Sequence, residues 1–327
     1  MRFLSFLILF FTVISCTNQQ KRTPFLPNVT GKSGEVVLVI NAESWNGDIG
    51  EEFRKSLLKG VEAMPQAEPM FDLINITPGA FSDIYKTHRN LIILEISGEH
   101  KEPKFTPQKD VWAKPQVLLT LNANSGENMV KLISENATKI QSVFLDAERN
   151  RFMNYYKKYE EKSIREKLLK EHKLGLIVPK GYSIGMDTNN FVWISHEPPD
   201  LNQHIFVYYY DYKDKDAFTP EKLIEKRNLF LKKYVSGPIP GSYMTTEEKY
   251  PPDYYEINYK GRYFAQLKGL WKVEGYFMGG PFINYTTLDE KRNRAVTVEG
   301  AVYAPRLDKR DYMRQLESIL FTLGFPD

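Results

Sequence analysis

The first half of the chain contains short apolar runs in which hydrophobic and polar positions do not alternate. Strands of this composition are usually covered on both faces by other layers of the fold. Helical patterns separate the runs, so residues 34–123 are predicted to form a small α/β layer domain. The predicted strands are 35–41, 71–76, 91–96 and 117–121.

Two helical patterns with apolar stripes accompany these runs. The first helix is predicted to start at Asp48, with Glu51 as its capping-box partner, and to end at Pro65. A long helical segment, residues 124–173, is predicted to link the two halves of the chain. The stripe of the first helix consists of Phe53, Leu57, Val61 and Met64.

Residues 174–327 show mostly short strand patterns, interrupted by two helical ones. One helix is predicted to begin at Thr219-Pro220, and the last to run from Asp308 to Gly324. This half is predicted to be an antiparallel-sheet α/β sandwich, which makes the whole chain α+β. The predicted strands are 191–195, 204–212, 254–259, 262–268, 270–277, 282–287 and 295–303.

The start of the chain reads as a secretory signal with an anchoring residue. Arg2 precedes an apolar run from Phe3 to Ile14, whose helical length of about 18 Å is too short for a hydrocarbon core of about 30 Å. The residues that follow, ending in Cys16, resemble the bacterial lipoprotein signal, with Val13 in place of the more usual Leu. That resemblance implies that residues 1–16 contain a signal cleaved before Cys16, and that acyl chains such as palmitate on Cys16 anchor the protein to a membrane.

Residues 17–33 are polar, contain two prolines and have no periodicity, so they are predicted to be a flexible tether. No acidic residue lies between Thr17 and Arg22. By resemblance to sorted lipoproteins, this places the protein on the outer membrane, facing the periplasm.

The composition of the chain limits the classes of function that are expected. A net charge of +3 over 327 residues does not favour nucleic-acid binding. Cys16 is the only cysteine, so no disulfide is expected. Nineteen of the 20 tyrosines follow residue 150, and their aromatic rings could form a surface that binds a glycan or a peptide. Because consecutive strand residues point to opposite faces, however, these tyrosines cannot all lie on one surface.

Several segments of the second half resemble an uncharacterised lipoprotein family of Bacteroidota, a domain of unknown function. They are Gly269-Leu-Trp271, Met278–Phe282, Val298–Pro305 and Lys309–Glu317. The order of elements after Val178-Pro-Lys-Gly-Tyr182 also resembles the PsbP/Mog1-type sandwich. Neither resemblance implies a reaction, a cofactor or catalytic residues.

Two small groups of residues are candidates for chemistry or contact. His196 and His204 flank a predicted hairpin, with Glu197 beside them, and could form a metal or acid–base site; the alternative is polar strand ends near Pro198. Gly279 and Gly280 could let a ligand or partner approach an exposed chain reversal; the alternative is a tight turn or bulge.

Two functions from different classes are therefore open. The first is a lipid-anchored, non-enzymatic envelope protein that binds a protein partner or a glycan, with no cofactor and no bound metal. The second is a periplasmic hydrolase acting on cell-wall or lipid material through His196, Glu197 and His204.

Overall fold

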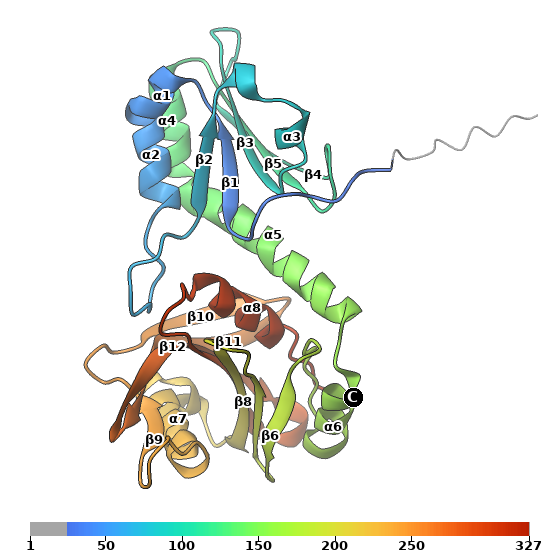
Figure 1. Cartoon of the computed structure of the whole chain (residues 1–327), viewed down its shortest axis with the longest axis vertical. Coiled ribbons are helices and arrows are strands. Elements are labelled where there is room, and N and C mark those ends of the chain that lie inside the picture. Colours follow the sequence, from blue (N-terminus) through green and yellow to red (C-terminus); the bar gives the residue numbers. More distant parts are fainter. Residues whose placement is uncertain (1–24, 327) are drawn as a thin grey trace, which may run out of the picture.

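The computed structural model describes residues 25–326 and has the predicted α+β architecture. Two separate sheets lie one above the other in Figure 1, and a long helix, α5 (Ala137–Lys158), runs from the first to the second. The two halves of the chain that the sequence patterns distinguish thus form two domains, each built around its own sheet.

The first sheet has the strand order β2–β1–β3–β5–β4. Its first four members run parallel, and β4 joins β5 as an antiparallel edge. The edge strand β4 was not predicted, because it is largely exposed and contains a proline. The strands are β1 (Glu35–Val39), β2 (Asp72–Ile76), β3 (Asn90–Ile96), β4 (Lys104–Lys109) and β5 (Val117–Ala123).

Both faces of the first sheet are covered, as its apolar runs predicted. Val36 and Leu38 pack beneath helices α2 and α4 and the first part of α5, whereas Val37 and Val39 pack toward Phe81 on the opposite face. The helices are α1 (Ala42–Asn46), α2 (Asp48–Leu57), α3 (Asp83–Lys86) and α4 (Gly126–Glu135), with a 3₁₀ turn η1 (Pro78–Ala80).

The second sheet is antiparallel throughout, with the order β10–β11–β12–β13–β8–β7–β6, and β9 adds to β11. Two predicted strands merge into β11, which continues through Gly269. The strands are β6 (Ser183–Asp187), β7 (Phe191–His196), β8 (Asn202–Asp211), β9 (Tyr243–Thr246), β10 (Asp253–Tyr259), β11 (Arg262–Glu274), β12 (Tyr276–Asp289) and β13 (Arg294–Tyr303).

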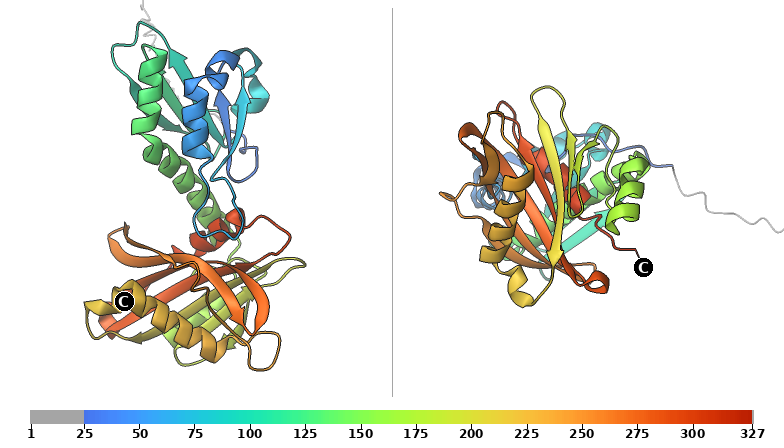
Figure 2. Two further views of the ribbon diagram at one scale, coloured as in Figure 1. Left: turned by 90° about the vertical axis from the view of Figure 1, so that its left-hand side faces the viewer. Right: turned by 90° about the horizontal axis from the view of Figure 1, so that it is seen from below.

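Helices cover the two faces of this sheet and make a sandwich of three layers (Figure 2). Helix α7 packs on one face through Phe230 and Leu231, and α8 packs on the other through Leu316 and Ile319. The covering elements are α6 (Lys162–Lys167), the π-helical turn η2 (Leu168–His172), α7 (Pro220–Tyr234) and α8 (Arg310–Leu320), with 3₁₀ turns η3 (Lys215–Phe218) and η4 (Glu290–Arg292).

The segment after α2 corrects a sequence prediction. The helix expected to reach Pro65 ends at Leu57, and residues 58–70, named here the arm, form a loop closed by a bridge between Gly60 and Pro69. The arm extends from the first domain to helix α8 of the second domain (Figure 1). There the Glu68 carboxylate accepts hydrogen bonds from the backbone N–H groups of Lys309 and Arg310 at 2.7–2.9 Å.

Candidate functional site

The two histidines of the predicted site do not meet. In the β7–β8 ladder, His204 lies opposite Ser195, and His196 lies opposite Gln203. Because successive strand residues point to opposite faces, the two imidazoles lie on different sides of the sheet. The expectation that His196, Glu197 and His204 converge is therefore wrong, and the hydrolase hypothesis loses the residues on which it depended.

Each histidine also has a structural partner of its own. His196 Nδ1 lies 2.8 Å from the Gly181 carbonyl oxygen, and its ring packs on Tyr182. His204 is buried and accepts a hydrogen bond of 3.2 Å from Trp193 Nε1. Burial lowers the pKa of His204 to about 4, so it acts as a neutral acceptor in the sheet. The Glu197 residue is exposed.

Gly279 and Gly280 lie within strand β12, and the chain reverses instead at Gly275. A Cβ atom on Gly280 would lie 2.0 Å from the Val302 carbonyl oxygen, and one on Gly279 would lie 2.6 Å from the Trp271 carbonyl oxygen. The β11–β12 ladder changes register beside them, after Lys272. Close packing of neighbouring strands thus explains both glycines, in agreement with the bulge alternative.

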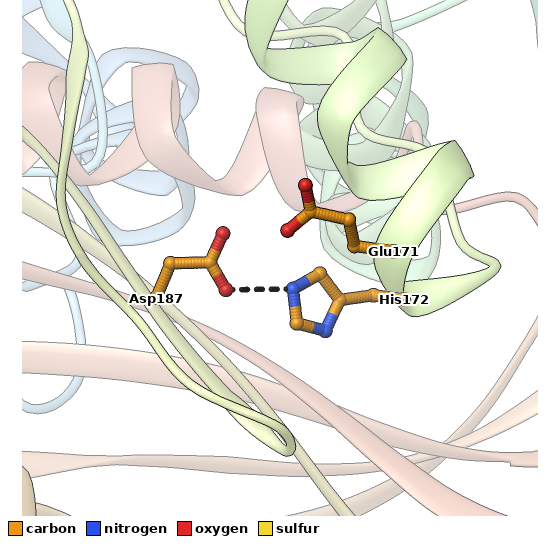
Figure 3. A group of neighbouring side chains, drawn as sticks. All are labelled: Glu171, His172 and Asp187. Atoms are coloured by element: carbon orange, nitrogen blue, oxygen red, sulfur yellow. Dashed lines mark hydrogen bonds and ion pairs between the residues drawn. The ribbon is translucent and has the colours of Figure 1, made fainter.

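Within residues 25–326, one group of three side chains has the composition of a metal site: Glu171, His172 and Asp187. Figure 3 shows that they come from η2 and from strand β6 on the facing sheet edge. Their nearest ligand atoms all lie within 4.8 Å of one another. Sequence reasoning missed the group, because positions 171–172 and 187 belong to different elements.

The polar contacts of this group join η2 to strand β6. His172 Nε2 lies 2.9 Å from Asp187 Oδ1, and Nδ1 lies 3.0 Å from the Tyr209 hydroxyl, which donates to the Asn189 carbonyl. Lys167 Nζ lies 2.8 Å from the other Asp187 oxygen. Both imidazole nitrogens of His172 and both oxygens of the Asp187 carboxylate are therefore engaged, and these contacts hold η2 against β6.

A cavity of about 290 Å³ lies where the arm and helix α5 meet helix α8 and strand β12. Cavities between domains are common binding sites. Its walls combine apolar side chains, among them Met64, Met70 and Met313, with charged ones. The cationic members are Lys59, Arg149, Lys268, Arg310 and Arg314, and the acidic members are Glu62, Glu148 and Glu317.

The charged residues at this junction connect the two domains. Arg310 donates to Asp72 at 2.7 and 3.2 Å, and Arg314 donates to the Met70 carbonyl. Sequence reasoning missed these residues; the four-residue spacing of Arg310 and Arg314, which places them on one face of α8, is a signal that could have drawn attention to them. Val61 and Met64, predicted as part of a helical stripe, line this cavity instead.

The lipidation residue predicted from the sequence, Cys16, lies outside the described residues. Within residues 25–326, no helix is both long and apolar enough to cross a membrane. The attachment of the chain to a membrane therefore remains a prediction from its first residues.

Two families of unknown function match the chain. Residues 161–322 match the domain of unknown function DUF4837, and residues 29–157 match the domain of unknown function DUF8532. No curated protein matches the sequence. The resemblance of the second half to a family of unknown function is thus confirmed, and its assignment to Bacteroidota and the PsbP/Mog1 likeness stay predictions.

Two solved structures were matched over part of the chain. LpqN of Mycobacterium tuberculosis, described as involved in cell envelope biogenesis, is 13% identical with a TM-score of 0.30, over 47% of this chain and 83% of LpqN. A protein of Bacteroides thetaiotaomicron is 9% identical with a TM-score of 0.22, over 47% of this chain and 46% of its own. The two family matches together cover most of the chain, and both families are of unknown function.

Proposed function

We propose that this protein is an envelope lipoprotein that is anchored through Cys16 and binds a partner or glycan rather than catalysing a reaction. The charged start, the short apolar run and the single cysteine support the anchor. The absence of acidic residues after Cys16 supports a place on the periplasmic face of the outer membrane, by resemblance to sorted lipoproteins of Bacteroidota.

The cavity between the two domains is the observation that carries the binding role. It is formed by the arm and α5 from one domain and by α8 and β12 from the other, so both domains contribute to a single concave surface. Methionines in its wall can adapt to the shape of a ligand, because their side chains are unbranched and flexible. Polar groups beside them would fix its orientation.

Two measurements test the two parts of the proposal. Cells fed labelled palmitate should incorporate it into the native chain and not into a Cys16→Ala variant. A photoreactive residue in place of exposed Lys59, at the cavity, should give a specific adduct in intact cells, whereas the same residue in place of exposed Lys131 on α4 should not. Equal labelling at both positions, or none at Lys59, would refute binding at the cavity.

A further inference from the structure

We infer that the cavity between the domains binds an anion that carries a short apolar group, such as a carboxylate or a phosphate monoester. This inference rests on the proposed function and names the ligand class of the same site. Five of the charged side chains in the wall are cationic and three are acidic. Some of these charges already pair with one another, because Lys268 Nζ lies 3.8 Å from a Glu62 oxygen and Arg149 Nη2 lies 3.9 Å from a Glu317 oxygen. The arginine donors that remain unused therefore decide whether the wall can bind an anion.

Each acidic group has partners of its own in the folded chain. Glu148 is buried and receives hydrogen bonds from Arg151 Nη1 at 2.8 Å and from Asn90 Nδ2 at 2.9 Å. Glu62 accepts from the Tyr255 hydroxyl at 2.8 Å, and Glu317 accepts from the Tyr285 hydroxyl at 2.5 Å. The carboxylate oxygens of these three residues therefore already accept hydrogen bonds from the protein itself.

Two arginines keep donors that are not used. Arg314 Nη1 and Arg149 Nε are buried and have no hydrogen-bond acceptor among the described residues. The carboxylate oxygen paired with Arg314 Nη1, on Asp311, is 3.5 Å away. Burial and then the charge of Arg310 lower the pKa of Arg314, against the carboxylates of Asp311, Glu148 and Glu317, which raise it.

An anion would supply what these groups lack. Hydrogen bonds between guanidinium groups and carboxylate or phosphate are short and strong, and a buried donor left without an acceptor is costly. The methionines and Ile283 in the same wall would receive an apolar chain. With a volume of about 290 Å³, the cavity limits that chain to a short one.

Titration calorimetry on the full chain in phosphatidylcholine nanodiscs, with empty nanodiscs subtracted, tests the inference. Hexyl phosphate and hexanoate should bind about tenfold or more tightly than hexanol, which has the same chain without the charge. Hexylammonium should not bind. Inorganic phosphate should bind more weakly than hexyl phosphate, and equal binding of the two would overturn the apolar part of the inference and point to a free anion.

Variants locate the binding. Arg314→Gln should weaken hexyl phosphate binding about tenfold, and Arg149→Gln gives the same test should the first variant fail to fold. Arg306→Gln is the matched control, since Arg306 is exposed and lies outside the cavity wall. Unchanged binding in both cavity variants, or hexanol binding as tightly as the anions, would overturn the inference. A specific adduct at position 59 without preferential binding of anions would overturn this inference and leave the proposed function standing. If neither the adduct nor the preference for anions is found, the proposed binding function is refuted as well.

Discussion

The pair of Arg227 and Glu299 shows how much one buried charge depends on another. Both side chains are fully buried between α7 and the sheet, and Arg227 Nε and Nη2 donate to Glu299 at 2.9 and 2.8 Å. Replacing Arg227 with Met should lower the free energy of unfolding by about 3–5 kcal/mol, because Glu299 is left buried without its partner. Urea unfolding followed by circular dichroism measures this change.

The double variant Arg227→Met, Glu299→Leu is the control for that prediction. Removing both charges leaves neither uncompensated, so much of the lost stability should return. If the double variant is no more stable than the single one, the loss comes from packing around Arg227, including its contact with Phe282, rather than from the charge.

His204 gives a pH dependence whose sign is fixed by its burial. Its pKa is about 4 in the folded chain and about 6.5 when unfolded, so the unfolded state binds more protons between these values. The contribution to stability is therefore complete above pH 6.5 and is lost as the pH falls toward 4, by roughly 2 kcal/mol at pH 5. A His204→Gln variant should show a smaller drop in unfolding free energy between pH 7 and pH 5, and an unchanged drop would refute the assignment.

The same histidine shows where sequence reasoning ends at the level of single residues. The hairpin that brings His196 and His204 onto neighbouring strands was predicted, and the structure contains it. The faces on which they lie depend on the register of β7 and β8, and a shift of one residue would reverse them. No local pattern in the sequence fixes that register, so the site could not be excluded before the fold was known.

At the level of elements, apolar periodicity was informative where it ended in a clear signal. The start of α7 at Thr219-Pro220 is confirmed, because proline suits the first helical turn. The helix from Asp48 ends early, since Val61 and Met64 face the cavity between domains rather than the core of the first. A stripe of apolar residues has the same appearance whether it packs within a domain or between two.

Strand β12 carries a prediction about its glycines. Gly280→Ala should destabilise the protein by about 1–3 kcal/mol or more, because the new Cβ would lie 2.0 Å from the Val302 carbonyl oxygen. Gly98→Ala is the matched control, since a Cβ there would meet nothing within 4 Å, and its effect should stay within about 0.5 kcal/mol. Thermal unfolding compares the two. A stable Gly280→Ala variant would contradict the strand-packing explanation and reopen a contact role for this position.

At the scale of the whole molecule, the α+β class followed from the patterns, whereas the docking of the two domains did not. The docking depends on pairs such as Asp72 with Arg310, which are 238 residues apart in the chain. Each such residue is ordinary in its own segment, as a charged side chain on a helix or at the start of a strand. Only the fold brings them together, and the cavity exists for the same reason.

The Glu68 carboxylate provides a test of that docking, because it caps α8 from the other domain. Glu68→Ala removes the acceptor for the backbone N–H groups of Lys309 and Arg310, and should cost about 1–2 kcal/mol of unfolding free energy. Loss of this bond should also free the arm, so limited proteolysis should cut within residues 58–70 faster than in the native chain. Exposed Glu102, replaced in the same way, should change neither measurement. Unchanged cleavage of the arm in the Glu68→Ala variant would mean that Arg310 and Arg314 hold the domains together without it.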